Sequence, residues 1–293
     1  MRVAVVGPGA IGATFGAVAE TAGHEVVLCG RRAAPAPVVE RPDGAEHALA
    51  SDVRADPAAA DGPVPWVLLA VKAHQTAGAA DWLAALCDAA TTVAVLQNGV
   101  EHRALVAPLA GAATVVPSVV WCPSETIAPG RVRQRDDAAL VVADDAAGDA
   151  LAALLEPGGA RVDRVADFPV EAWRKLTVNA VAGLMAVTRR RAEVFRLDGV
   201  AELALAYARE CVAIARAEGA ALPEGEAEAV VARLAGMPGD LGTSIMFDRL
   251  AGRPMEWDTR NGVVRRLGAR HGIPTPVSDV LVPLLEALDD APA

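Results

Sequence analysis

The N-terminal part of the chain alternates between short apolar runs and longer stretches with helical spacing. Residues 2–6 contain four apolar residues in five, mostly β-branched valine, which predicts a fully buried strand. From Ile11 onward the apolar residues recur at helical intervals, so a helix follows the turn at residues 7–12. Further strands are predicted at 25–29, 66–71, 92–96, 115–121, 131–135, 139–142 and 161–165. A short additional strand is expected around 47–53. Buried strands that alternate with helices predict an α/β fold with a doubly wound sheet.

After Asp167 the strand pattern stops and the spacing of apolar residues is helical. Glycine or proline stands at most junctions between the helical segments. The predicted helices cover residues 170–187, 193–218, 224–234, 243–250, 259–271 and 278–288. The sequence therefore predicts a Rossmann-type domain of residues 1–167, followed by an all-helical domain of residues 168–293.

The turn between the first strand and the first helix has the spacing G-x-G-x-x-G. It consists of Gly7, Pro8, Gly9, Ala10, Ile11 and Gly12. In such a turn Gly7 permits the sharp change of direction, Gly9 lets the backbone approach a pyrophosphate, and Gly12 lets the helix pack closely on the sheet. A glycine-rich turn without a ligand is the alternative. Its position between a strand and a helix favours dinucleotide binding.

The residues after the second strand indicate which dinucleotide is bound. An acidic residue there would bind the ribose 2′-hydroxyl of NAD, whereas a basic residue accommodates the 2′-phosphate of NADP. The chain has Arg31 and Arg32 at this point and no carboxylate. Two arginines on a solvated loop are the alternative. We expect NADP(H).

Two other predicted strands end in polar residues. Lys72 and Gln75 follow the strand at 66–71, and Asn98 follows the strand at 92–96. The carboxyl ends of parallel strands meet at one edge of the sheet, where doubly wound folds bind ligands. We expect these side chains at the ligand-binding edge.

The helical half contains polar residues that suit carbonyl reduction. Lys175 and Asn179 are four residues apart and share a helix face, while Ser244 and Glu256 lie further along the chain. Reduction needs a proton donor for the developing alkoxide and an anchor for the rest of the substrate. A lysine whose head group reaches solvent and a glutamate that caps a helix are the structural alternatives.

The composition of the chain narrows the classes of partner. The net charge of −10 argues against nucleic acid. The four cysteines form no C-x-x-C pair, which fits free thiols in a reducing compartment, and no metal site is expected. The uncharged run at 176–188 is too short to span a bilayer, and no signal peptide is recognised. We expect a cytoplasmic protein that binds neither nucleic acid nor membrane.

Five segments together resemble the ketopantoate reductase (2-dehydropantoate 2-reductase) family over nearly the whole length. They are V-V-G-P-G-A-I-G, V-K-A-H-Q, L-Q-N-G-V, W-R-K-L-T-V-N, and the long S-I-M-F-D-R-L-A-G-R-P-M-E-W-D-T-R-N-G segment with its continuation to G-I-P-T-P. The long segment is far more specific than the glycine turn. The resemblance implies NADPH-dependent reduction of 2-dehydropantoate to (R)-pantoate, a step in pantothenate biosynthesis.

The resemblance also implies roles for individual residues. Lys175 would be the general acid with Glu256 as its catalytic companion, and Asn179 and Ser244 would bind substrate. Asn98 would lie near both nicotinamide and substrate. Lys72 and Gln75 would lie on the NADP side, and Arg31 at the 2′-phosphate.

One position departs from the family pattern. Members of the family often carry a second asparagine one turn after the first, where this chain has Gly183. Gly183 favours one alternative, a related reductase of another 2-oxo acid. A second alternative, a non-catalytic NADP-binding sensor, is opposed by Lys175 and Glu256, since a sensor needs no proton donor. We expect a small-molecule 2-oxo acid as partner and consider a homodimer as the assembly.

Overall fold

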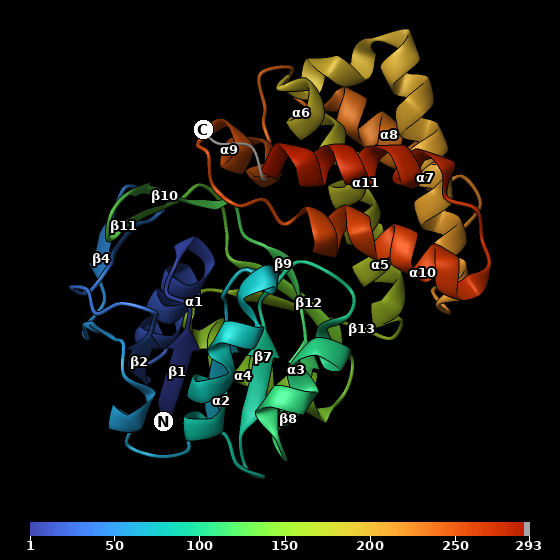
Figure 1. Cartoon of the computed structure of the whole chain (residues 1–293). Helices are drawn as coiled ribbons and strands as arrows, with labels where there is room; N and C mark the ends of the chain where they lie inside the picture. Colours follow the sequence, from blue (N-terminus) through green and yellow to red (C-terminus); the bar gives the residue numbers. More distant parts are fainter. Residues whose placement is uncertain (290–293) are drawn as a thin grey trace. The chain divides into compact units, whose positions relative to one another are not determined.

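The computed structural model describes residues 1–289. The chain forms two compact units, Met1–Phe168 and Pro169–Ala293 (Figure 1). We call them unit 1 and unit 2 and describe each by itself.

Unit 1 is built on a six-stranded sheet in the order β5-β2-β1-β6-β7-β8. Every neighbouring pair in this sheet is parallel. Its strands are β1 (Arg2–Val6), β2 (Glu25–Cys29), β5 (Val53–Arg54), β6 (Trp66–Leu69), β7 (Thr92–Val95) and β8 (Thr114–Pro117). Strands are added on one side of β1 and then, from β6, on the other. The predicted doubly wound sheet is confirmed, with its topological switch point between β1 and β6.

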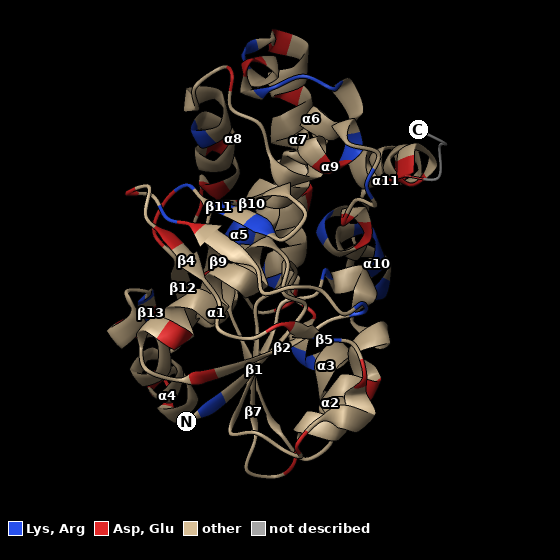
Figure 2. Ribbon diagram, turned by 90° about the vertical axis from the view of Figure 1, so that its left-hand side faces the viewer, with Lys and Arg blue, Asp and Glu red and all other residues tan. Residues whose placement is uncertain are grey.

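Both faces of this sheet are buried, which explains the continuous apolar runs. Successive residues of β1 alternate between two cores: Val3 and Val5 belong to one, Ala4 and Val6 to the other. Helices α1 (Ala10–Thr21) and α4 (Ala146–Leu155) contribute to the first core, and α2 (Ala80–Leu86) and α3 (His102–Ala110) to the second. In Figure 2 the middle of the sheet is tan, and the charged residues lie at its ends and on surrounding elements.

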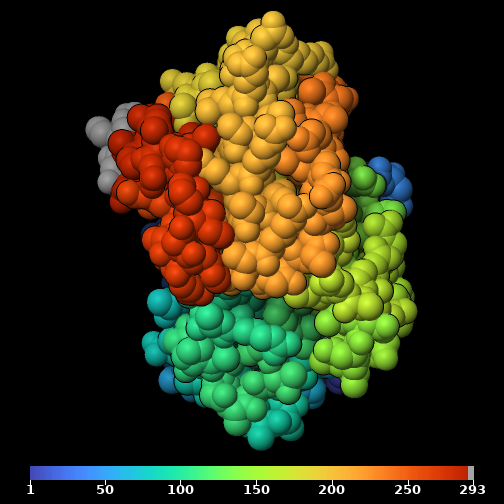
Figure 3. Space-filling view, turned by 90° about the vertical axis from the view of Figure 1, so that its right-hand side faces the viewer, coloured from blue at the N-terminus to red at the C-terminus, as the bar shows by residue number. Residues whose placement is uncertain are grey.

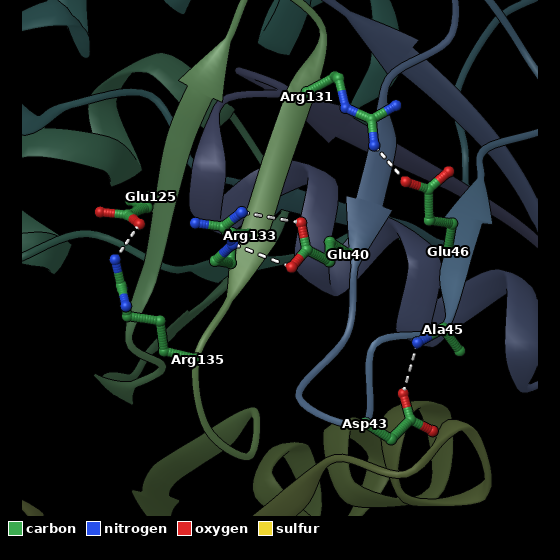
Figure 4. A network of polar contacts seen from close by, with 8 residues as sticks. All are labelled: Glu40, Asp43, Ala45, Glu46, Glu125, Arg131, Arg133 and Arg135. Atoms are coloured by element: carbon green, nitrogen blue, oxygen red, sulfur yellow. Dashed lines mark hydrogen bonds and ion pairs between the residues drawn. The ribbon is translucent and has the colours of Figure 1, made fainter.

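Two smaller sheets complete unit 1, in the orders β10-β11-β3-β4 and β13-β12-β9. The strands are β3 (Val38–Glu40), β4 (Glu46–Ala48), β9 (Val119–Trp121), β10 (Ser124–Ala128), β11 (Arg131–Gln134), β12 (Ala139–Ala143) and β13 (Arg161–Val165). Ion pairs join strands of the four-stranded sheet (Figure 4). Arg133 of β11 pairs with Glu40 of the neighbouring β3, and Arg131 of β11 reaches across β3 to Glu46 of β4. Arg135, just after β11, pairs with Glu125 of β10. Exposed charged side chains thus cover one face of this sheet, and its other face is apolar.

Two strand predictions in unit 1 are corrected, and two strands, β3 and β10, were not predicted. The stretch 47–53 contains no single strand, because β4 ends at Ala48 and β5 begins at Val53. The predicted strand 115–121 is two strands in separate sheets, since Pro117 has no backbone N–H with which to continue the ladder. Strand β10 was not predicted, because its exposed, polar residues carry no pattern of burial.

Unit 2 is helical throughout its described residues, as expected. Its elements are α5 (Phe168–Val181), α6 (Gly183–Thr188), η5 (Ala192–Arg196), α7 (Asp198–Ala217), α8 (Glu226–Gly236), α9 (Ser244–Leu250), the π-helical turn η6 (Asp258–Gly262), α10 (Val263–His271) and α11 (Pro276–Asp289). The single helix predicted at 170–187 is divided at Ala182, and the one predicted at 193–218 is divided at the extended residue Leu197. Arg189 then ends α6 with a positive φ of 55°.

The core of unit 2 is organised around the 20-residue helix α7. Tyr207 on this helix is fully buried. Glu210, one turn on, accepts hydrogen bonds from the amide of Ser278 at 3.1 Å and from its hydroxyl at 2.9 Å. These bonds hold the N-terminus of α11, which lies beside α7 (Figure 3). A carboxylate at a helix N-terminus is favourable because it complements the helix dipole.

All four cysteines are free, with Cys29 and Cys211 buried. Among residues 1–289 no helix combines the length and apolar character that a membrane crossing requires.

Candidate active site

The glycine turn lies at the switch point of the large sheet. Gly7 has a φ of +93°, and a Cβ atom there would stand 2.6 Å from the backbone nitrogen of Val71, two residues after β6. A Cβ on Gly12 would stand 2.2 Å from the carbonyl oxygen of Gly7. Both positions therefore exclude a side chain, for the reasons that the sequence predicted.

Gly9 differs from its two neighbours in the motif. A Cβ on Gly9 would meet no atom of residues 1–289 within 4 Å. Gly9 is also the N-cap of α1 and provides no side-chain cap for the first amides of that helix. Open space beside uncapped amides at a helix N-terminus suits a phosphate group. The local geometry fits a dinucleotide.

The strand-end loops of unit 1 are tied together by Gln97, which sequence analysis did not single out. Its buried Nε2 donates to the carbonyl oxygen of Val71 and to Oγ1 of Thr76, each at 2.9 Å. Val71 and Thr76 bracket the loop that carries Lys72 and Gln75. This loop and the turn that carries Asn98 are thus held at the same edge of the sheet.

His102, at the start of α3, lies against the backbone of the turn that carries Asn98. Burial lowers the pKa of its imidazole to about 4, although the backbone of Asn98 and Gln97 favours the charged form. The ring is therefore neutral near pH 7 and packs against the turn. No pattern in the sequence marks this histidine, because its role depends on burial.

Arg31 and Arg32 follow β2 and are exposed. The same strand end is close to the glycine turn, because the amide of Gly7 donates to the carbonyl oxygen of Cys29 at 2.8 Å. Lys72, Gln75 and Asn98 are partly buried. The residues predicted for the cofactor thus lie on loops that begin at the ends of β1, β2, β6 and β7.

In unit 2 four side chains form what we call the polar cluster: Lys175, Ser244, Glu256 and Arg260. The first three were predicted as site residues from the sequence. Arg260 Nη2 donates to Ser244 Oγ at 2.9 Å and lies 3.4 Å from Glu256 Oε2. Ser244 is exposed, whereas Glu256 and Arg260 are buried. Sequence analysis missed Arg260.

Lys175 is linked to this cluster by charge. Its pKa is lowered to about 7, first by burial and then by the positive charges of Arg260 and Arg233. An amine with a pKa near neutrality gives up a proton readily at physiological pH, which suits a general acid. Asn179 lies one turn further along α5 and is partly buried.

Gly183, which departs from the family pattern, has a packing role. A Cβ there would stand 2.8 Å from Nδ2 of Asn261. That Nδ2 donates to the carbonyl oxygen of Ala180 at 2.8 Å and to the hydroxyl of Tyr207 at 2.9 Å. The buried amide of Asn261 thus fills the space that a side chain at position 183 would require.

Among the described residues, no group of three or more histidine, cysteine, aspartate or glutamate side chains could hold a metal ion.

Comparison with known proteins covers both units. The family model described as ketopantoate reductase PanE/ApbA matches residues 3–147, and its C-terminal counterpart matches residues 167–289. A 2-dehydropantoate 2-reductase of Mycobacterium tuberculosis is 48% identical over 99% of this chain and 98% of its own length. The corresponding enzyme of Caulobacter vibrioides is 41% identical over 97% and 98%.

Among solved structures, a PanE/ApbA family ketopantoate reductase from Ralstonia eutropha JMP134 superposes with a TM-score of 0.89. It is 31% identical, and the match covers 99% of both chains. The likeness therefore extends over the Rossmann-type and the helical parts alike. This chain belongs to the ketopantoate reductase family.

Proposed function

We propose that this protein reduces 2-dehydropantoate to (R)-pantoate with NADPH, a step towards pantothenate and coenzyme A. The observation that carries the proposal is the polar cluster, in which burial and the positive charge of Arg260 help to lower the pKa of Lys175 to about 7. A protein that only senses NADP has no use for such a proton donor. The family membership supports the choice of substrate.

Unit 1 would hold the cofactor. The amides of the Gly7–Gly12 turn would bind the pyrophosphate, and Arg31 would pair with the 2′-phosphate, with Lys72 and Gln75 on the same side. When bound, the nicotinamide supplies the hydride that adds to C2 of the substrate. The absence of a carboxylate at residues 30–32 supports NADPH over NADH.

Unit 2 would supply the proton and hold the substrate. As hydride addition places negative charge on the C2 oxygen, the Lys175 ammonium donates a proton from Nζ to that oxygen. Glu256 would orient the lysine and accept from the product hydroxyl. Ser244 and Asn179 would bind the remaining polar groups of the substrate.

The test is NADPH oxidation followed against a panel of 2-oxo acids that includes ketopantoate. The proposal expects ketopantoate to have the highest kcat/KM. Gly183 is the observation that favours an alternative, a reductase of another branched 2-oxo acid, and a higher kcat/KM for such an acid would establish it. A protein that binds NADPH but oxidises it with no 2-oxo acid would be the sensor instead.

The proposal also includes a homodimer located in the cytoplasm, where NADPH is available. Light scattering of the purified protein would give twice the mass of one chain, and a mass of one chain would overturn the dimer.

A further inference from the structure

Arg260 is a buried cation to which no role towards the substrate has been assigned so far. It lies in the π-helical turn η6, and only 3% of its surface is exposed. Single π-turns are often found at functional sites because they shift side chains out of the regular helical register. Burial of a guanidinium is costly unless its donors are satisfied, so the surroundings of Arg260 need an explanation.

The hydrogen bonds of Arg260 leave part of its capacity unused. Nη2 donates to Ser244 Oγ at 2.9 Å, and its 3.4 Å separation from Glu256 Oε2 is longer than charge-assisted bonds usually are. The buried Nε has no acceptor among the described residues. Arg260 also disfavours the charged form of Lys175. An anion bound near Arg260 would offset its positive charge and favour the ammonium form of Lys175.

The contact with Ser244 determines where such an anion would bind. A serine hydroxyl has one proton to donate and two lone pairs. Because Ser244 Oγ accepts from Arg260, its own proton is left to point elsewhere, and Ser244 is exposed. A carboxylate on the exposed side of Ser244 would accept this proton and would lie one hydroxyl group away from the guanidinium.

We propose that Arg260 selects the carboxylate of the substrate: it orients the Ser244 hydroxyl towards that carboxylate and supplies the positive charge that attracts it. This inference rests on the proposed function and deepens it, because it explains why a 2-oxo acid rather than a neutral ketone is bound. Arg260 acts through Ser244 and is therefore a positioning residue.

The experiment compares an acid with a neutral substrate that differs only in its charge. The pair is 3-methyl-2-oxobutanoate and its methyl ester, assayed beside ketopantoate with the parent, Arg260→Met and Arg260→Lys. A charge-assisted hydrogen bond to a carboxylate corresponds to roughly a ten- to hundredfold change. Arg260→Met should lower kcat/KM for both acids by this factor, mainly through KM, and leave the ester nearly unchanged. Arg260→Lys should restore part of the loss, because it keeps the charge.

A purely structural role would give a different result. If Arg260→Met lowered kcat/KM for the acid and the ester alike, or for neither, the inference would be wrong. Arg265→Met is the matched control, because Arg265 is an exposed arginine of the adjacent α10 that pairs with Asp279. It should leave the ratio of acid to ester activity unchanged.

A binding measurement keeps the inference testable if a variant or the parent has no activity. Calorimetry on the NADP⁺-loaded protein would compare pantoate, which has a carboxylate, with its neutral lactone. Arg260→Lys should weaken the binding of pantoate several-fold and leave the binding of the lactone unchanged. Equal losses of affinity for both would contradict the proposed role of Arg260 in carboxylate selection. If the parent oxidised NADPH with no 2-oxo acid yet bound pantoate through Arg260, the proposed function would fail and this inference would stand.

Discussion

The two units build their candidate sites from different parts of the polypeptide. In unit 1 the site is mostly backbone: a glycine turn, uncapped amides of α1 and the ends of neighbouring strands. In unit 2 it is mostly side chains, contributed by α5, α9 and η6 and brought together by packing. A backbone site is local in the sequence, whereas a side-chain site depends on helices that are distant along the chain. Variants that alter the site of one unit and spare that of the other test this division.

Removal of the Lys175 side chain should affect chemistry and leave cofactor binding intact. A positioned general acid contributes on the order of 10²–10⁴ in rate, so Lys175→Ala should lower kcat by such a factor. The affinity for NADPH, measured by fluorescence titration, should stay near that of the parent. Lys175→Arg should be nearly as slow, because a guanidinium keeps its proton at neutral pH. A parent-like kcat in Lys175→Ala would refute the assignment.

Replacement of Arg31 should weaken the binding of the cofactor and leave the chemical step intact. A charge-assisted hydrogen bond to phosphate contributes about 1.5–3 kcal/mol, roughly ten- to a hundredfold in Kd. Arg31→Ala should weaken the binding of NADPH by this factor and leave the affinity for NADH unchanged, since NADH has no 2′-phosphate. Binding titrations with both cofactors measure the difference. Equal affinity of the parent for NADPH and NADH would show that Arg31 has no such role.

The glycines of the turn allow stability and binding to be separated. Gly7→Ala places a side chain at a positive φ and against the backbone of Val71, so we expect the free energy of unfolding to fall by about 1–3 kcal/mol. Gly9→Ala adds a methyl group that contacts none of the residues that the structure describes, so it should leave that free energy within about 0.5 kcal/mol of the parent. The Gly9→Ala variant should nevertheless bind NADPH more weakly than the parent. Urea unfolding and NADPH titration of both variants measure this, and an equal loss of stability would contradict the distinction.

The pH dependence of the reaction should reflect the pKa of Lys175. Because this pKa is lowered to about 7, the ammonium form is lost as the pH rises above 7. We therefore expect kcat/KM for reduction to fall about tenfold between pH 8 and pH 9. Removal of the positive charge in Arg233→Met should move the midpoint to higher pH, since Arg233 contributes to the lowered pKa. Arg233 is exposed, so its loss should cost little stability. A profile that is level from pH 6 to pH 9 would exclude Lys175 as the acid.

The sequence predicted those features whose causes are local. The glycine turn, the buried strands of the large sheet and the helical character of unit 2 follow from spacing and from residue type within a few positions. The sequence did not predict the interruption of the helix at Ala182, where the carbonyl of Ala180 accepts from the side chain of Asn261, a residue far along the chain. Strand β10 was missed for a related reason: it is held by pairing with β11 and shows no apolar alternation.

The same reasoning explains why Arg260 was missed. It stands in the polar stretch D-T-R-N-G, and sequence patterns treat charged residues as exposed by default. Only packing shows that it is buried and that its guanidinium contacts Ser244. The roles of Lys175, Glu256, Asn98, Asn179 and Ser244 came from the family resemblance and stay predictions until the variants are measured.

The position of α1 has a consequence for how unit 1 folds while it is being synthesised. One face of this helix packs against β10, β11 and α4, which come late in the unit. Contacts between segments that are distant in the chain form slowly, and a nascent chain that exposes apolar surface tends to associate with other chains. A chain that ended after β8 would contain all six strands of the large sheet but would leave α1 uncovered. We therefore expect such a fragment to aggregate rather than to bind a dinucleotide, although it contains the entire glycine motif.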